Sequence, residues 1–344
     1  MTDRELIHIA LPRIADWCAR SRRALPWREE PTPYRVWISE IMLQQTRIEA
    51  VIPYYERFLT ELPDVAALAA VEDDRLMKLW EGLGYYSRAR NLKKAAVEIL
   101  ERFGGALPAS AAELKTLPGI GEYTAGAIAS IAFGLSEPAV DGNVLRVVSR
   151  LLASGEDVLL PATRRRITAL LRESYPAGER SALVTEGLME LGETLCVPGG
   201  GARCALCPLR GLCRAEAEGA VERYPLRTPP KERRVEERTV LLLQCLGRTA
   251  IRRRAEKGLL AGLWEFPSLP GRQSEEALRA LYPDALSIRS CGEARHAFTH
   301  VEWHMTGFRV ELPREPEGYV WADAGEIRSR YSVPTALKYY LKQL

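Results

Sequence analysis

The chain has 344 residues, of which 47% are hydrophobic and 27% charged, as is typical of a globular protein. Its formal net charge of +3 does not by itself indicate a nucleic-acid-binding protein, although 48 Lys and Arg residues leave room for basic patches. No apolar run reaches the roughly 20 residues that a membrane span needs. Residues 1–13 lack the apolar region of a secretory signal, so we expect a cytoplasmic protein without a membrane partner.

Residues 5 to about 190 have the pattern of helices joined by short turns. Thr32 is a favourable N-cap and Pro33 a favourable first residue for one of these helices. That helix is expected to carry, at helical spacing, Val36, Trp37, Glu40, Leu43, Gln44 and Arg47. Further helices are predicted at Arg75–Trp80, Ala89–Phe103, Thr124–Phe133, Val144–Leu152 and Arg164–Ser174.

Two short segments place glycines between predicted helices, Gly82-Leu-Gly84 and Gly119-Ile-Gly121, and form a weak internal repeat. After the second segment the next helix starts at once, so that successive backbone N–H groups point outward. Such a turn suits a DNA phosphate, or it only connects two helices. Asp141 follows twenty residues later, and on its own it is best explained as the N-cap of the helix Val144–Leu152.

Four of the seven cysteines lie in one short stretch: Cys196, Cys204, Cys207 and Cys213. An odd number of cysteines without a secretory signal argues against a disulfide framework. Thiolates this close together are soft ligands for zinc or for an iron–sulfur cluster, and the alternative is a set of reduced core cysteines. Zinc ribbons favour two Cys-x2-Cys pairs, whereas this stretch has one.

The chain changes character after Cys213. We predict a domain at residues 1–221, a charged and proline-rich linker at 222–238 with Pro225, Pro229 and Pro230, and a mixed α+β domain at 239–344. In the last domain, strands are expected at Thr239–Leu246, Thr249–Arg254, Glu302–Glu311 and Tyr319–Trp321. Helices are expected there at Ser274–Leu281 and Pro334–Leu341.

Residues 5 to about 220 resemble the helix–hairpin–helix DNA glycosylase superfamily. The resemblance is carried by Trp37-Ile-Ser-Glu40-Ile-Met-Leu43-Gln44-Gln45-Thr46, Gly82-Leu-Gly84-Tyr85-Tyr86, Arg88-Ala-Arg90-Asn91 and Leu188-Met-Glu-Leu-Gly192, together with the hairpin and Asp141. It implies an all-α domain of two helical lobes that extrudes the target base from duplex DNA. It also implies DNA contacts by Gly119 and Gly121.

The cysteine spacing resembles the [4Fe–4S] loop of the endonuclease III and MutY family. The resemblance implies a structural [4Fe–4S] cluster held by the four cysteines. The first gap has one residue more than the family's usual spacing, in the run 199–201, where glycine tolerates an insertion.

Bifunctional members of the superfamily carry a lysine just after the hairpin, which forms a Schiff base with the sugar. Tyr123 occupies that position, and a phenol cannot form an imine. We therefore expect a monofunctional enzyme that uses water. Glu40 and Asp141 match the two carboxylates of the family, and Tyr123 and Asn143 are expected to position them.

The resemblance gives the two carboxylates different roles. The apolar neighbours of Glu40 are expected to raise its pKa, so that it can protonate N7 of adenine and later activate water. Asp141 is expected to be kept ionised by backbone amides and to stabilise the cationic sugar, with or without a covalent bond.

Other residues match the adenine-binding and DNA-binding positions of MutY-like enzymes. The expected adenine pocket comprises Arg23, Leu25, Trp27, Arg28, Leu43 and Glu186. Composition alone makes Trp27 equally suited to a core position. Gln45 and Tyr85 match residues that wedge into the duplex, and Thr46 is expected to contact DNA beside them.

The segments Gly262-Leu-Trp264-Glu265-Phe266-Pro267 and His296-Ala-Phe298-Thr299-His300 resemble the Nudix-like domain attached to adenine glycosylases. Only Glu275-Glu276 stands where a Nudix hydrolase has a longer acidic motif, so we expect binding without hydrolysis. The resemblance implies that Phe298, Thr299 and His300 sense 8-oxoguanine. In isolation such a triplet more often serves packing.

The resulting hypothesis is a monomeric adenine glycosylase that acts on duplex DNA with adenine opposite 8-oxoguanine or guanine. Two alternatives remain open. One is a bifunctional glycosylase of the endonuclease III type, and the other is a helix–hairpin–helix protein that binds DNA without catalysis.

Overall fold

The computed structural model describes residues 1–229 and 232–344. The chain divides into two compact units. The first unit comprises residues 1–70 and 91–229, and the second comprises residues 71–90 and 230–344. Pro230, assigned to the predicted linker, lies outside the described residues. No helix in the described part of the chain is long and apolar enough to cross a membrane.

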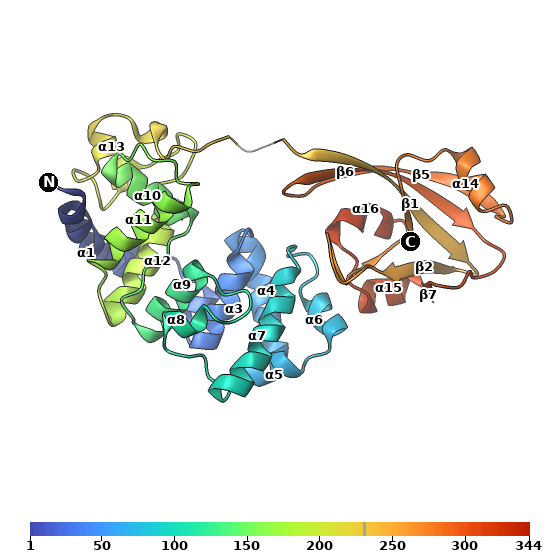
Figure 1. The fold of residues 1–344 in the computed structure, drawn as a ribbon, viewed down its shortest axis with the longest axis horizontal. Coiled ribbons are helices and arrows are strands. Elements are labelled where there is room, and N and C mark those ends of the chain that lie inside the picture. Colours follow the sequence, from blue (N-terminus) through green and yellow to red (C-terminus); the bar gives the residue numbers. More distant parts are fainter. Residues whose placement is uncertain (230–231) are drawn as a thin grey trace. The chain divides into compact units, whose positions relative to one another are not determined.

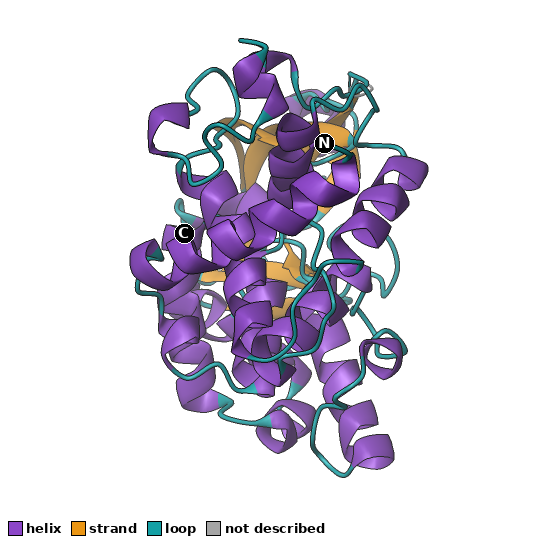
Figure 2. Cartoon of the chain, turned by 90° about the vertical axis from the view of Figure 1, so that its left-hand side faces the viewer, coloured by secondary structure: helices purple, strands orange, loops and turns teal. Residues whose placement is uncertain are grey.

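The first unit is helical (Figures 1 and 2). Its helices are α1 (Asp3–Ser21), α2 (Pro26–Glu29), α3 (Pro33–Leu43), α4 (Ile48–Glu61), α5 (Val65–Ala70), α7 (Ser87–Phe103), α8 (Ala111–Leu114), α9 (Glu122–Phe133), α10 (Gly142–Leu152), α11 (Pro161–Arg172), α12 (Glu179–Thr194) and α13 (Arg214–Ala217). Helix α7 begins in the second unit and continues into the first. Short 3-10 turns lie at Cys204–Leu206 and Val221–Arg223.

Apolar faces of four helices form the main core of this unit. Helix α1 packs against α12, and α10 and α11 complete the cluster. Leu6 of α1, Val147 of α10 and Leu188 of α12 are almost completely buried there. In a second contact, α3 packs against α9. These two packings bring the ends of α3, α9, α10 and α12 to the cavity described below.

The second unit combines a short helix and turn of residues 71–90 with a mixed sheet. Its strands are β1 (Arg234–Cys245), β2 (Arg248–Arg253), β3 (Trp264–Glu265), β4 (Ser268–Pro270), β5 (Ser287–Ala297), β6 (Val301–Glu311) and β7 (Val320–Ala322). The order is β3-β2-β1-β6-β5, with β4 paired to β1 and β7 to β2. Strands β1 and β6 run parallel, and β5 and β6 form an antiparallel hairpin.

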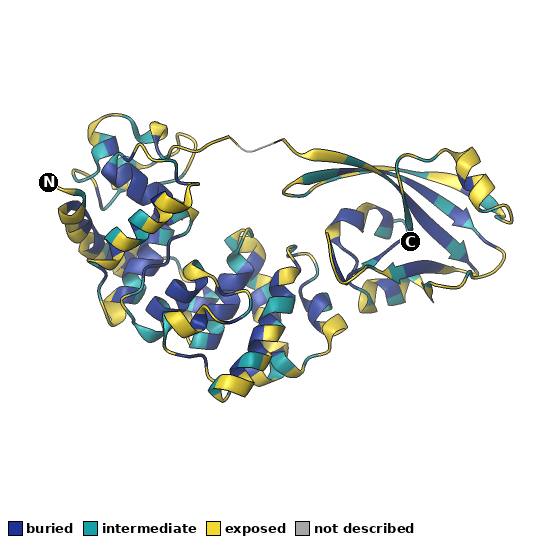
Figure 3. Ribbon diagram, in the orientation of Figure 1, coloured by how far each residue is buried: buried dark blue, intermediate teal, exposed yellow. Residues whose placement is uncertain are grey.

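Side chains of β1 alternate between two cores, one on each face of the sheet. Figure 3 shows the second half of this strand as mostly buried. Val240 and Leu242 pack with helices α15 (Ala324–Arg330) and α16 (Lys338–Leu341). Leu241 and Leu243 pack on the other face with α14 (Glu275–Leu281). The remaining helix of the unit is α6 (Asp73–Leu79). The mixed α+β prediction for this part of the chain is confirmed.

Several predicted boundaries agree closely with the structure because their caps are local. Thr32 accepts a hydrogen bond from the Arg35 N–H and begins α3, and Ser274 caps α14 in the same way. The end predicted for the linker, 238, is wrong, since β1 already begins at Arg234. The charged residues at this end of β1 are ordered by pairing with β6, which a composition count does not show. Strand β5 and helix α15 were not predicted.

Candidate active site

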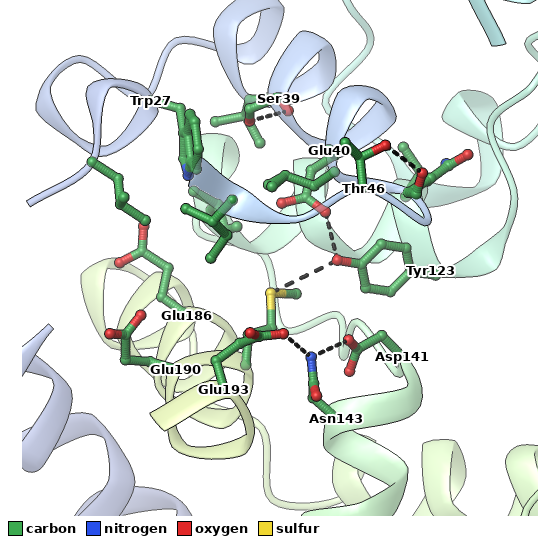
Figure 4. A pocket seen from close by; sticks show the side chains of 18 of the residues that line it. Trp27, Ser39, Glu40, Thr46, Tyr123, Asp141, Asn143, Glu186, Glu190 and Glu193 are labelled. Carbon is green, nitrogen blue, oxygen red and sulfur yellow. Dashed lines mark hydrogen bonds between the residues drawn. The ribbon is translucent and has the colours of Figure 1, made fainter. Parts of the chain in front are cut away.

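A cavity of about 1050 Å³ opens in the first unit (Figure 4). It contains all ten residues that the sequence assigns to catalysis and to the adenine pocket. The predicted residues among its lining are Arg23, Leu25, Trp27, Arg28, Glu40, Leu43, Gln45, Thr46, Gly121, Tyr123, Asp141, Asn143 and Glu186. Residues that lie more than 160 positions apart in the sequence therefore line the same cavity.

Glu40 lies on α3 and is 5% exposed. The hydroxyl of Tyr123, at the start of α9, donates a hydrogen bond to Glu40 Oε2 at 2.6 Å. Burial raises the pKa of Glu40 to about 7, while the hydrogen bond from Tyr123 lowers it and the charge of Asp141 raises it further. A carboxyl group with this pKa retains a proton near neutral pH and can act as a general acid. The expectation of a raised pKa is met.

Asp141 caps α10, as its position before Val144 predicts. Its Oδ1 accepts the Val144 N–H at 2.7 Å, and its Oδ2 accepts from Asn143 Nδ2 at 3.0 Å. The backbone amide of Val144 donates to this carboxyl group as expected, but burial acts against it. Burial raises the pKa of Asp141 above its usual value and outweighs the opposing hydrogen bonds from Val144 and Asn143.

Asn143 bridges Asp141 to Glu193, a residue that the sequence did not identify. The second hydrogen bond of its Nδ2 goes to Glu193 Oε1 at 2.9 Å, and its Oδ1 accepts from Arg146 Nη2 at 2.7 Å. A Cβ atom at Gly192 would lie 2.6 Å from Asn143 Cβ, so α12 can approach α10 this closely only with glycine there. The amide of Asn143 is therefore fixed at all three polar positions.

The adenine-pocket segment between α1 and α3 is held mainly by glutamates of α12. Arg23 Nε lies 2.6 Å from Glu190 Oε1, and Arg28 Nη2 lies 3.0 Å from Glu190 Oε2. Glu186 accepts a hydrogen bond from Arg22. Trp27 was considered either for the adenine pocket or for the core, and it lies in both. It lines the cavity and packs edge-on against Tyr55, with ring centroids 5.4 Å apart.

Glu190 belongs to a segment that resembled the superfamily but was not predicted as a site residue. Its spacing of four residues from Glu186 places both side chains on one face of α12, and that spacing was the available signal. Its partners lie about 165 positions earlier in the chain, so the ion pairs themselves could not be read from the local pattern.

The glycine hairpin begins α9. Gly119 has a φ of +78°, and a Cβ atom there would lie 2.7 Å from Asn91 Cβ, so this position requires glycine. Gly121 is the N-cap of α9 and offers no side chain to its first N–H groups. The geometry is compatible with an anion at this helix end, and phosphate binding stays a prediction.

Gln45 and Tyr85 share an unusual backbone. Their φ values of 59° and 47° lie in the left-handed region, which non-glycine residues seldom occupy. Such strain is often found at functional positions. Gln45 is exposed at the rim of the cavity. Tyr85 belongs to the second unit, and its hydroxyl lies 3.3 Å from Thr299 Oγ1, which brings together two residues predicted to contact DNA.

Phe298, Thr299 and His300 form the turn between β5 and β6. Phe298 N donates to Val301 O at 2.8 Å and closes the hairpin. The Phe298 ring packs edge-on against Trp303 at 4.9 Å and against His296 at 4.6 Å, whereas Thr299 and His300 are exposed. The turn thus anchors one aromatic side chain and presents two polar ones.

The four clustered cysteines line one small cavity of about 30 Å³. Arg150 Nη1 lies 3.3 Å from Cys196 Sγ and also donates to the backbone of that loop. Across residues 1–229 and 232–344, no group of three or more His, Cys, Asp or Glu side chains is arranged to hold a metal ion. Four soft sulfur donors around one cavity, beside a guanidinium, are nevertheless a donor set that fits an anionic iron–sulfur cluster.

Comparison with known proteins agrees with this arrangement. Residues 38–176 match the family model of the HhH-GPD superfamily base excision DNA repair proteins, and residues 238–343 match that of the NUDIX domain. Among solved structures, the helical part resembles a thermostable thymine-DNA glycosylase, with 26% identity and a TM-score of 0.56, covering 62% of this chain and 98% of that one. An endonuclease III–DNA complex is similar at 25% identity and a TM-score of 0.53, covering 64% and 99%.

Two curated relatives cover most of the chain. The adenine DNA glycosylase of Homo sapiens is 32% identical over 94% of this chain and 72% of its own length. That of Buchnera aphidicola subsp. Acyrthosiphon pisum is 30% identical over 87% and 86%. Relatives of this identity match most of the chain and more than two thirds of their own length, and both domain models match as well. This chain belongs to the adenine DNA glycosylase family.

Proposed function

We propose that this chain removes adenine from duplex DNA in which the adenine is paired with 8-oxoguanine or guanine, and that it does so as a monofunctional glycosylase. The observation that carries the proposal is the buried Glu40, hydrogen-bonded to Tyr123 at 2.6 Å in a cavity that also contains Asp141. Base flipping is required because a stacked adenine cannot reach these groups.

The proposed reaction is an acid-assisted hydrolysis. Glu40 donates its proton to N7 of adenine, so that the bond between N9 and C1′ breaks with its electron pair leaving on the base. The sugar becomes a cation that faces Asp141 and favours the ionised form of that carboxyl group. Water then attacks C1′ and gives a proton to Glu40, which restores the acid. Asn143 keeps Asp141 in place through the hydrogen bond at 3.0 Å.

Tyr123 supports water as the nucleophile. It stands just after the hairpin, where bifunctional relatives carry the lysine that forms a Schiff base. Its phenol cannot form that adduct and instead orients Glu40. Treatment with borohydride in the presence of the lesion duplex should therefore yield no stable enzyme–DNA product. A trapped adduct would support the alternative of an endonuclease III-like bifunctional enzyme.

The second unit supports the specificity for the opposite base. Phe298, Thr299 and His300 combine an anchored ring with two exposed polar groups, which suits stacking on a base and hydrogen bonding to its edge. In this proposal the turn distinguishes 8-oxoguanine from guanine, while the cavity in the first unit acts on adenine.

The four cysteines would hold a [4Fe–4S] cluster with a structural role, since they lie at the C-terminal end of the helical domain, away from Glu40 in the chain and lining a different cavity. The purified protein should then be yellow-brown and contain four iron atoms per chain. A colourless protein that contains zinc would refute the cluster.

Single-turnover assays on three duplexes test the function. Adenine opposite 8-oxoguanine should be released fastest and adenine opposite guanine more slowly, whereas thymine opposite guanine should remain intact. Absence of adenine release from the first duplex would favour the alternative of a non-catalytic DNA-binding protein. The protein is proposed to be cytoplasmic. Its acting form is proposed to be a monomer, and light scattering with and without DNA can test this oligomeric state.

A further inference from the structure

One face of α12 lines the cavity and contacts several of its functional groups. Its side chains at positions 186, 189, 190 and 193 line the cavity at helical spacing (Figure 4). Met189 contacts the Tyr123 hydroxyl at 3.8 Å, and Glu193 holds Asn143. Glu190 has no part in the reaction described above, yet its side chain is only 1% exposed.

Glu190 fixes both the backbone and the side chain of Arg23. Its Oε1 accepts from Arg23 Nε at 2.6 Å and lies 3.4 Å from the Arg23 main-chain nitrogen. The Arg23 carbonyl oxygen accepts in turn from Arg28 Nη1 at 3.0 Å, and Arg28 Nη2 lies 3.0 Å from Glu190 Oε2. One buried carboxylate therefore orders the segment from Arg23 to Arg28, which forms a wall of the cavity.

Arg28 lies between two glutamates and is closer to one of them. Its Nη2 is 3.0 Å from Glu190, whereas its Nε is 3.8 Å from Glu186 Oε1, which is beyond hydrogen-bond distance. The other oxygen of Glu186, Oε2, accepts from Arg22. Glu186 Oε1 is thus left able to accept a hydrogen bond from a ligand in the cavity.

We propose that Glu190 is a positioning residue for adenine specificity: it draws Arg28 away from Glu186, so that Glu186 Oε1 can accept the 6-amino group of the flipped base. The proposal rests on the proposed function and adds to it the reason why a 6-aminopurine is preferred. Without Glu190, the guanidinium of Arg28 would close on Glu186 and occupy the oxygen that the base needs.

The charge balance agrees with this role. Three arginines, Arg22, Arg23 and Arg28, face two glutamates, so that each carboxylate has more than one cation available. Burial tends to raise the pKa of Glu190, but the hydrogen bonds and charges of Arg23 and Arg28 outweigh it, and the pKa is lowered. Glu190 is therefore ionised at neutral pH and competes with Glu186 for Arg28.

The test compares two substrates in the same variant. Single-turnover excision is measured on duplexes that carry, opposite 8-oxoguanine, either adenine or the purine that lacks the 6-amino group. Both bases retain N7 for Glu40. The ratio of the two rates cancels any loss of folded or cluster-containing protein, which a merely structural role of Glu190 would affect equally for both substrates.

In Glu190→Gln we expect this ratio to fall by about 10-fold to 100-fold, the size expected for a lost hydrogen bond to a charged group. Glu186→Gln should lower the ratio as well, and adding Glu190→Gln to it should change the ratio little further. Glu190→Asp keeps the charge, so its ratio should lie between that of the wild type and that of Glu190→Gln. If Glu190→Gln does not fold, Glu190→Asp is measured in its place.

Glu265→Gln is the matched control, since Glu265 is also a buried carboxylate with two arginine partners, Arg252 and Arg254, but lies in the second unit. Its ratio should equal that of the wild type. An unchanged ratio in both Glu190 variants would overturn the proposal, as would an equal fall in Glu265→Gln. Failure of the wild type to release adenine from the first duplex would instead refute the proposed function, so the two failures are distinguishable.

Discussion

The catalytic cavity of the first unit and the 298–300 turn of the second unit hold their functional residues in opposite ways. In the cavity, Glu40 is buried and joined to Tyr123 by a hydrogen bond of 2.6 Å. In the turn, Phe298 is anchored by ring contacts, while Thr299 and His300 remain exposed. The groups proposed to move protons are buried and fixed, whereas the polar groups proposed to read a base edge are exposed. Changes in the cavity should therefore alter the excision of the adenine itself, and changes in the turn should mainly alter the preference for the base opposite the adenine.

The largest expected effect is that of Glu40→Gln. The variant lacks the proton that assists the leaving base, so the rate of adenine excision should fall by about 1000-fold or more. Binding to the lesion duplex should persist, because phosphate contacts supply most of the affinity. Single-turnover rates and a binding isotherm measure the two quantities. Loss of binding together with loss of the folded state would make Glu40 a structural residue.

The same variant should be more stable than the wild type at alkaline pH. The pKa of Glu40 is raised to about 7 from a usual value of 4.5, so the folded protein retains a proton that the unfolded chain loses between these values. Stability therefore falls as pH rises through this window, and Glu40→Gln should recover about 1 to 3 kcal/mol at pH 8 and little at pH 5. Urea unfolding at the two pH values checks the sign, and an equal gain at both would contradict it.

The next effect concerns the pH dependence of excision. The wild-type rate should decline above the pKa of Glu40, about 7, since the acid form is then depleted. Tyr123→Phe removes a hydrogen bond that lowers this pKa, so the alkaline decline should move to higher pH. The maximal rate should drop by about 10-fold because Glu40 is less well oriented. A shift of the decline to lower pH would show that Tyr123 acts on Glu40 in another way.

A smaller effect is expected in the turn. Phe298→Ala removes the edge contacts with Trp303 and His296, which are worth about 0.5 to 1.5 kcal/mol each. The preference for 8-oxoguanine over guanine opposite adenine should fall by about 10-fold, which corresponds to about 1.4 kcal/mol. Tyr339→Ala is the control, because Tyr339 packs edge-on against Tyr340 in the same unit but outside the turn. Equal losses in both variants would assign the effect to general packing.

The two regions also differ in how much of them could be predicted. In the first unit, Thr32 and Asp141 set helix starts by local hydrogen bonds, so residue type and spacing sufficed. The rise in the pKa of Asp141 could not be predicted. Capping amides can be inferred from the sequence, whereas the degree of burial, which raises the pKa, cannot. Glu190 was missed for a related reason: its partners, Arg23 and Arg28, come from a segment distant in the sequence.

In the second unit, the fold was less predictable than the site. The turn at Phe298 stood in a segment that resembled a known domain. The strand that leads to it, β5, has only one buried residue among eleven and little apolar alternation. Its conformation comes from pairing with β6, with a bulge between Ser290 and Gly292. Tertiary pairing of this kind overrides the local pattern.

The smallest expected effect tests whether the turn is ordered before DNA binds. The hydroxyls of Tyr85 and Thr299 lie 3.3 Å apart, and a hydrogen bond between exposed hydroxyls contributes about 0.5 kcal/mol. Thr299→Val and Tyr85→Phe should each lower the excision rate about twofold through loss of this bond. In the double variant the second substitution should lower the rate less than it does alone, since the bond is already broken. Additive effects in this double-mutant cycle would mean that the two residues act on DNA independently. A shared effect would instead mean that the residues proposed to contact the opposite base are also held in place before DNA binds, though more weakly than those of the cavity.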